Sequence, residues 1–204
     1  MDDDGRTMQR DPDVRIECAP SVYTPAEDTF LMLGAIAIAR DERVLEMGCG
    51  SGMISVHCAK AGAVITAVDV NPEAVKCTKT NASRNDVLVN VVTSDLFDEV
   101  KGTYDLILFN PPYLRGDERT IEDKAWAGGP TGTETLFRFL EAAVPHLDPK
   151  GRIIVIVSSD MDQSALDKVL KPFTVKELAS MRLFFEELRV LELRPVSGRP
   201  RSVF

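Results

Sequence analysis

Residues 44–52, VLEMGCGSG, decide the fold of this chain. An apolar run that passes straight into a loop of alternating glycines predicts a buried strand, a tight turn and the start of a helix. In such a turn the backbone can approach a bound molecule closely, and the N-terminus of the following helix offers free N–H groups. The glycine pattern alone is a weak signal, because a tight turn that binds nothing uses the same residues.

On both sides of this stretch, helical periodicity alternates with short β-rich runs, which is typical of an α/β domain. The predicted strands are residues 43–47, 63–70, 87–93, 104–110, 151–159, 173–182 and 185–194, and the predicted helices are residues 29–40, 53–61, 72–83 and 133–146. Crossovers between the first five strands predict parallel pairing, whereas the short gap before the last strand permits only an antiparallel pair. We expect a Rossmann-like α/β fold, with a mostly parallel seven-stranded sheet, an antiparallel C-terminal strand and helices on both faces.

The overall composition is that of one ordinary globular domain. The chain has 204 residues, of which 44% are hydrophobic and 27% are charged. We expect residues 1–20, which are rich in aspartate, to form a disordered lead-in, and residues 21–204 to form a single domain. No apolar segment reaches the length of a membrane span and no signal-peptide core is visible, so a cytoplasmic location is expected.

Charge and metal-binding residue types narrow the choice of function. The net charge of −8, from 24 basic and 32 acidic residues, argues against a protein that grips phosphate backbones. The four cysteines contain no C-x-x-C pair, and the two histidines belong to no carboxylate cluster. We therefore expect reduced cysteines packed as small apolar residues, and no metal site.

The spacing of the glycines separates two classes of cofactor. The dinucleotide fingerprint G-x-G-x-x-G would place its third glycine at position 53, but Met53 stands there and the third glycine is Gly52. Glu46, beside the loop, would repel a pyrophosphate, whereas it suits the cationic amino-acid end of S-adenosylmethionine. The spacing favours the sulfonium cofactor.

Carboxylates end three successive predicted strands at Glu46, Asp69 and Asp95. In open α/β sheets, ligands bind at the edge formed by the carboxyl ends of the strands. Asp69 is placed to accept hydrogen bonds from ribose hydroxyls, because it follows the glycine loop by about 20 residues. Each carboxylate alone is more often a solvated loop residue, but the three together predict a binding site for S-adenosylmethionine.

Residues 110–113, NPPY, directly follow the fourth predicted strand. A planar amide or aromatic amine is a poor nucleophile, and an enzyme activates it by accepting both of its N–H bonds. The side-chain oxygen of Asn110 and the carbonyl oxygen of Pro111 can supply these two acceptors, in a turn that Pro112 stiffens. Tyr113 offers a ring that can stack on a flat group. A proline-rich turn with no catalytic role is the alternative explanation.

At these residues the sequence resembles the HemK-like glutamine N5-methyltransferases, which are class I methyltransferases, and in particular their short archaeal and eukaryotic branch. The similarity runs from residue 22 to about residue 204. It includes VYTPAEDTFL at residues 22–31, DVNPEA at residues 69–74 and AWAGGPTGTE at residues 125–134. The resemblance implies methyl transfer from S-adenosylmethionine, with S-adenosylhomocysteine as product, to the glutamine of a Gly-Gly-Gln motif in a class 1 release factor.

The resemblance also assigns roles to individual residues. The implied cofactor-binding residues are Glu27 (with Asp28 nearby), Thr29, Glu46, Gly48, Gly50, Asp69, Asp95, Leu96 and Asn110. The implied catalytic residues are Asn110, Pro111, Pro112 and Tyr113, and the implied substrate-binding residues are Asn110, Tyr113 and Trp126. Without the resemblance, Trp126 would more often be a core residue.

A partner is expected along the third predicted strand, because residues 87–92, VLVNVV, lack the charges that usually protect a sheet edge. The branch that the sequence resembles pairs there with a small zinc-binding activator, so we expect a heterodimer. A helix of the same chain that covers the edge is the alternative. The helical substrate-recognition domain of bacterial relatives is not expected, because about 20 residues precede the core.

Three other functions remain open from the sequence. An N6-adenine methyltransferase acting on DNA or RNA would use the same Asn-Pro-Pro-Tyr chemistry, although the net charge argues against nucleic acid. A protein lysine methyltransferase would act on an amine that is not planar, for which the Asn acceptor is less useful. A scaffold that binds cofactor without turnover is the non-enzymatic alternative.

Overall fold

The structure is a computed structural model that describes residues 7–116 and 128–196. Its strands are β1 (Arg43–Met47), β2 (Val64–Asp69), β3 (Asn90–Thr93), β4 (Tyr104–Phe109), β5 (Leu147–Ser158), β6 (Phe173–Arg182) and β7 (Glu187–Pro195). Its helices are α1 (Glu27–Ala35), α2 (Met53–Lys60), α3 (Pro72–Arg84), α4 (Glu134–Ala143) and α5 (Gln163–Leu170), with a 3-10 turn at Val144–His146.

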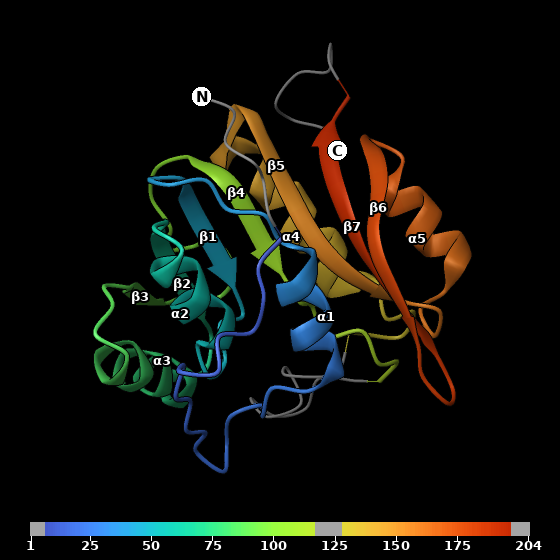
Figure 1. The fold of residues 1–204 in the computed structure, drawn as a ribbon. Coiled ribbons are helices and arrows are strands. Elements are labelled where there is room, and N and C mark those ends of the chain that lie inside the picture. Colours follow the sequence, from blue (N-terminus) through green and yellow to red (C-terminus); the bar gives the residue numbers. More distant parts are fainter. Residues whose placement is uncertain (1–6, 117–127, 197–204) are drawn as a thin grey trace.

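All seven strands form one sheet in the order β3-β2-β1-β4-β5-β7-β6 (Figure 1). The pairs from β3 to β5 are parallel, and β7 runs antiparallel to both of its neighbours, β5 and β6. This confirms the predicted fold class. The order reverses beside β1, which is the switch point where α/β sheets bind ligands.

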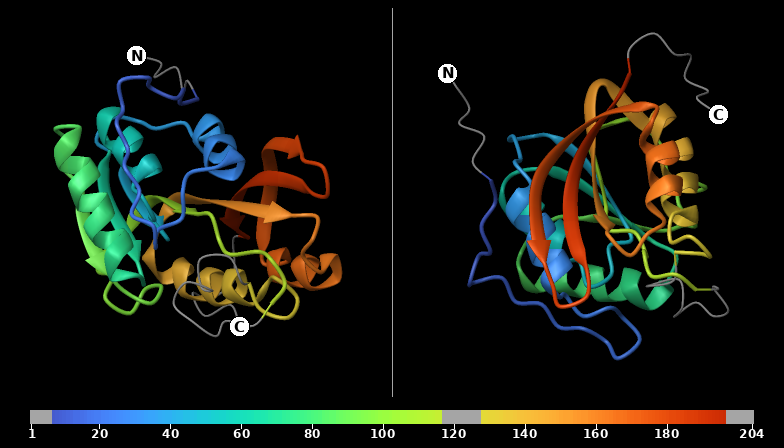
Figure 2. Two further views of the ribbon diagram at one scale, coloured as in Figure 1. Left: turned by 90° about the horizontal axis from the view of Figure 1, so that it is seen from below. Right: turned by 90° about the vertical axis from the view of Figure 1, so that its right-hand side faces the viewer.

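The sheet is a middle layer with helices on both faces (Figure 2, left). Successive residues of a strand point to opposite faces, and β1 divides its side chains in this way. Val44 belongs to the core cluster that includes residues of α1 and α2, while Leu45 belongs to the cluster on the opposite face that includes residues of α4. Both residues are fully buried, as expected for a central parallel strand.

Several predicted bounds differ from the structure. The first helix spans Glu27–Ala35 rather than residues 29–40, and the fifth strand begins at Leu147 rather than at residue 151. The third strand begins at Asn90 rather than at residue 87, because residues 85–87 still complete the C-terminal turn of α3. There the Val87 amide donates to the carbonyl of Ala82 over 3.1 Å. The last strand begins at Glu187, because Phe185 lies in the turn after β6. Helix α5 was not predicted, although Asp162 caps its N-terminus by accepting from the amide of Ala165.

Residues 7–20, which belong to the lead-in expected to be disordered, take a defined path in the structure. This segment runs along α2 and α3, and its backbone is tied to asparagine side chains of α3 and its C-cap. Asn81 accepts from the amide of Glu17 and donates to its carbonyl, and Asn85 makes the same pair of bonds with Arg15. Lys60 of α2 forms an ion pair with Asp11 at 2.9 Å. The side-chain amides replace strand or helix partners for this backbone, a possibility that composition did not reveal.

In the described part of the chain, no helix is long and apolar enough to cross a membrane. The described residues also contain no group of three or more histidine, cysteine or acidic side chains arranged to hold a metal ion.

Candidate active site

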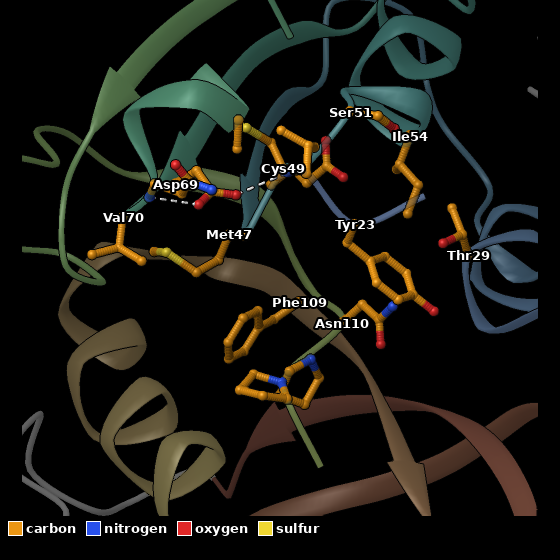
Figure 3. Close-up of a pocket in the computed structure, with 18 of the residues that line it drawn as sticks. Tyr23, Thr29, Met47, Cys49, Ser51, Ile54, Asp69, Val70, Phe109 and Asn110 are labelled. Carbon is orange, nitrogen blue, oxygen red and sulfur yellow. Dashed lines mark hydrogen bonds between the residues drawn. The ribbon is translucent and has the colours of Figure 1, made fainter. Parts of the chain in front are cut away.

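A cavity of about 240 Å³ opens at the carboxyl ends of β1, β2 and β4 (Figure 3). Its wall joins segments that are far apart in sequence, because parallel strands end at a common edge. Eleven of the residues assigned to the site from sequence line this cavity. They are Thr29, Glu46, Gly48, Gly50, Asp69, Asp95, Leu96, Asn110, Pro111, Pro112 and Tyr113.

Two predicted site residues are not placed at the cavity. Glu27 is exposed and does not line it, whereas its neighbour Asp28 is buried and does. Consecutive residues of a helix point about 100° apart, so the first turn of α1 directs only one of the two carboxylates inward. The cavity therefore gives no support for a role of Glu27, which stays a prediction from the family resemblance. Trp126 lies outside the described residues.

The glycine loop holds left-handed backbone conformations, and Gly52 shows why glycine is needed. Its φ is 78°, and a Cβ there would meet the Thr78 Cγ2 atom of α3 at 2.9 Å. Gly50, at φ 51°, has open space where a Cβ would stand. Glycine at position 52 therefore lets the start of α2 lie close to α3, and glycine at position 50 leaves room beside the cavity for a ligand.

The loop is fixed to β2 through the carboxylate of Asp69 (Figure 3). One oxygen accepts from the amide of Gly50 and the other from the amide of Asn71, both at 2.9 Å. Burial raises the pKa of Asp69, and these amide hydrogen bonds oppose the shift by stabilising the charged form. A fixed carboxylate at this place can accept hydrogen bonds from the hydroxyls of a ribose.

Glu46, at the carboxyl end of β1, is only 5% exposed. Its carboxylate accepts a hydrogen bond from the hydroxyl of Ser55 on α2. Burial raises the pKa of Glu46 to about 8, and the negative charge of Asp69 adds to the effect. A cation brought beside Glu46 would favour its charged form, so the site suits an ammonium group.

At the end of β3, Asp95 and Leu96 line the same cavity. Asp95 forms an ion pair with Arg138 of α4 at 3.2 Å, and both side chains are partly exposed. Leu96 has φ 47°, a conformation that is rare for a residue with a side chain and is concentrated at functional sites.

The Asn-Pro-Pro-Tyr turn follows β4 and holds Asn110 against α1. The side-chain Nδ2 of Asn110 donates to the carboxylate of Asp28 over 2.9 Å. Its Oδ1 is buried and has no hydrogen-bond partner among the residues that the structure describes. Such an atom is costly to leave unpaired, so it marks the place where a ligand N–H would bind. Burial, together with the charge of Asp28, raises the pKa of Tyr113, whose hydroxyl therefore stays protonated.

Gly128 and Gly132 lie against the backbone of the Asn-Pro-Pro-Tyr turn. A Cβ on Gly132, where φ is 76°, would meet the carbonyl oxygen of Tyr113 at 2.5 Å, and one on Gly128 would overlap the carbonyl oxygen of Pro112. The amide of Gly128 donates to the carbonyl of Leu114 over 2.8 Å. Only glycine lets the two backbones approach so closely.

Tyr23 is a site residue that the sequence did not single out for its own role. Its hydroxyl lies 3.1 Å from both carboxylate oxygens of Asp28, and Figure 3 shows it beside Asn110. Burial and the charge of Asp28 raise its pKa, so the hydroxyl is a donor. The match of residues 22–31 to a family motif was the available signal.

The residues at the cavity fit S-adenosylmethionine. Carboxylates stand at three strand ends, where Glu46 is buried and Asp69 is held by backbone amides. The loop leaves space at Gly50, and Asn110, which lines the cavity, has a side-chain oxygen without a partner among the described residues. This donor and acceptor set suits a ligand with an ammonium group and ribose hydroxyls. Together with the sheet order, it defines a class I methyltransferase that uses S-adenosylmethionine.

Comparison with known proteins agrees with this class. The family model of the methyltransferase small domain matches residues 25–181. A relative from Methanocaldococcus jannaschii is 41% identical over 87% of this chain and 94% of its own length. Its name describes it as a protein N5-glutamine methyltransferase, with an activity that is assigned rather than demonstrated. Methyltransferase HEMK2 of Mus musculus is 36% identical over 74% of this chain and 78% of its own length.

Among solved structures, the complex of Mtq2 and Trm112 from E. cuniculi superposes with a TM-score of 0.67 at 21% identity. The match covers 86% of this chain and 99% of the other, and it shows a shared fold. The chain belongs to the methyltransferase small-domain family and, within it, to the HemK-like branch of archaea and eukaryotes.

Proposed function

We propose that this enzyme methylates the side-chain amide nitrogen of a glutamine in a class 1 peptide-chain release factor, within a Gly-Gly-Gln motif. The observation that carries the proposal is the buried Oδ1 of Asn110, which has no partner within the described residues. A glutamine amide would supply the missing N–H. The M. jannaschii relative is named for N5-glutamine methylation, and the E. cuniculi complex is described as methylating the termination factor eRF1.

In the proposed reaction the chain orients a planar nitrogen and accepts its protons. Asn110 Oδ1 accepts one N–H and the carbonyl oxygen of Pro111 accepts the other, which raises electron density on the nitrogen. The ring of Tyr113 packs on the flat amide. S-adenosylmethionine, which the carboxylates of Glu46 and Asp69 would help to hold, would supply the electrophilic methyl group, with the neutral thioether S-adenosylhomocysteine as the second product. No general base is needed before transfer, because the nitrogen can lose its proton afterwards to water.

The substrate is tested by transfer of tritium from labelled S-adenosylmethionine. Three acceptors are compared: an intact release factor, its Gln→Ala version and duplex DNA. Label on the intact factor alone is the expected result. Label on DNA would replace the proposal with adenine methylation, and equal label on the Gln→Ala factor would indicate another residue, such as a lysine.

We also propose a heterodimer with a small activator protein that pairs along β3. Among the described strands, β3 pairs only with β2, so its other edge is open to a partner. Leu88, just before the strand, is 94% exposed, and Val91 and Val92 are partly exposed. The E. cuniculi neighbour is a complex with Trm112, and the family resemblance implies that such an activator binds zinc. An exposed apolar edge is a common surface for strand addition.

Copurification tests the edge. The double variant Leu88→Lys with Val91→Lys is expected to lose the activator, because two ammonium groups would have to be desolvated at the interface. Val175→Lys is the matched control, since Val175 is also exposed (43%) but lies in β6, the strand at the opposite edge of the sheet. Equal recovery of the activator with both variants would contradict the proposed interface.

A further inference from the structure

The amide of Asn110 has two ends, and only one of them can assist the proposed reaction. If Oδ1 faces the cavity, it accepts an N–H of the substrate. If the amide were rotated by half a turn, its NH₂ group would face the substrate's own N–H and activate nothing. Oxygen and nitrogen of an amide have nearly the same shape, so the hydrogen-bond network has to select the orientation.

The selecting group is the carboxylate of Asp28. It is 5% exposed, and every described side-chain contact to it comes from a donor. Asn110 Nδ2 lies 2.9 Å from one oxygen, and the Tyr23 hydroxyl lies 3.1 Å from both. The amide and hydroxyl of Thr29 donate to the other oxygen over 2.6 and 3.2 Å. An ionised carboxylate can only accept hydrogen bonds, so it pairs with the NH₂ end of Asn110. Oδ1 is then the end of the amide that is left for another partner.

We propose that Asp28, held in place by Tyr23, is a positioning residue that fixes the amide of Asn110 with its oxygen toward the substrate nitrogen. The inference rests on the proposed methylation of a planar nitrogen. This role accounts for the burial of the Asp28 carboxylate, whereas the neighbouring Glu27 is exposed. It also explains why Oδ1 has no partner within residues 7–116 and 128–196, where only the other end of the amide is hydrogen-bonded.

The carboxylate has a second set of contacts that the test must separate. Asp28 also binds the amide and hydroxyl of Thr29, a residue of the proposed cofactor site. A role through Thr29 would change cofactor binding, whereas a role through Asn110 would change the rate of transfer at saturating cofactor. The dissociation constant of the cofactor and kcat therefore report on different contacts.

The first variant is Asp28→Asn, which keeps the shape but can donate as well as accept, so it no longer selects one orientation of Asn110. We expect kcat to fall by roughly 10- to 100-fold, less than the loss on removing a transition-state acceptor outright. We expect cofactor affinity to stay within about threefold, because the Asn oxygen can still accept from Thr29. Tyr23→Phe should lower kcat by a smaller factor. Glu177→Gln, which changes an exposed carboxylate of β6 that does not line the cavity, is the control with no change.

The decisive measurement is a double-mutant cycle with Asn110→Ala. Once the amide is gone, neither Asp28→Asn nor Tyr23→Phe should slow transfer further, so the effects should not multiply. Effects that multiply, or a loss of cofactor affinity with kcat unchanged, would overturn the inference. Tyr23→Phe keeps the carboxylate and its buried contacts, so the cycle remains measurable if Asp28→Asn folds poorly.

The proposed function can fail separately from this inference. Wild-type enzyme is first tested on each acceptor, and the acceptor that becomes labelled identifies the function. The double-mutant cycle is then measured with that acceptor. If wild-type enzyme labels DNA and the cycle still shows no multiplication, the glutamine proposal falls while the role of Asp28 stands.

Discussion

At the level of single residues, Glu46 carries the clearest dependence on pH. Its pKa in the folded protein is about 8, against an ordinary value of 4.5, so the folded state retains a proton that the unfolded state has lost. The stability from this group is complete below pH 4.5 and is lost as the pH rises toward 8. Glu46→Gln removes the charge and can still accept from Ser55.

We therefore expect Glu46→Gln to be more stable than the wild type at pH 8, with the difference shrinking toward pH 5. Thermal unfolding of both proteins without cofactor, across this pH range, measures the effect. Glu27→Gln serves as an exposed control that should follow the wild type. A constant offset between Glu46→Gln and wild type at every pH would contradict the assigned burial of the charge.

The sequence predicted most of the residues at the cavity because they stand at strand ends, where β1, β2 and β4 converge in any sheet of this order. It could not show which of two neighbouring side chains turns inward, because orientation depends on the element packed against them. Glu27 and Asp28 are chemically alike, and only the packing of α1 against the sheet decides which one turns inward. The contact of Tyr23 with Asp28 likewise depends on how the segment before α1 folds back.

At the level of elements, the glycine loop makes a prediction that separates folding from binding. Gly52→Ala should lower the free energy of unfolding by about 1–3 kcal/mol from backbone strain, and by more because its Cβ meets Thr78 of α3. Gly50→Ala carries similar strain but no contact, and its Cβ stands in space beside the cavity. The Gly50→Ala variant should therefore bind the cofactor tenfold or more weakly than the wild type. It should also lose less stability than the Gly52→Ala variant.

Urea unfolding and titration with the cofactor measure the two quantities. Of the two variants, Gly52→Ala is expected to have the lower free energy of unfolding. Gly50→Ala is expected to have the lower affinity for the cofactor although it is the more stable variant. The reverse order would mean that the loop is oriented differently toward the ligand.

Element boundaries were predicted best where burial and turn residues agree. Strand β1 lies between charged residues and the glycine loop, and its predicted bounds match the structure. Strand β3 was predicted too long, because an apolar run does not reveal that residues 85–87 are engaged in closing α3. Helix α5 was missed although Asp162 is a good N-cap, since its apolar residues are few and the helix is short.

At the level of the whole molecule, the N-terminal segment is part of the fold. Its paired hydrogen bonds from Arg15 and Glu17 to α3 and its C-cap are each worth about 1 kcal/mol. Removing residues 1–17 should lower the free energy of unfolding by roughly 2–4 kcal/mol, as measured by urea denaturation. A truncated protein as stable as the full chain would show that these bonds are exchanged for equivalent bonds to water.

The fold class and family could be predicted from the sequence because several motifs fall at the ends of the predicted strands that one fold class requires. The ordered path of residues 7–20 could not, because their composition is that of a solvated tail. Their order comes from the side-chain amides of Asn81 and Asn85, which reach their partners only after α3 has formed.

The central claim is that the cavity activates the amide nitrogen of a glutamine. The most direct test is to treat a release factor with S-adenosylmethionine, the enzyme and its activator, and to locate the added methyl group by fragmentation mass spectrometry. The account predicts a single methyl group on the side-chain amide of the Gly-Gly-Gln glutamine, at least about 100-fold slower to form with Asn110→Ala. A methyl group on a lysine, or equal rates with Asn110→Ala, would contradict it.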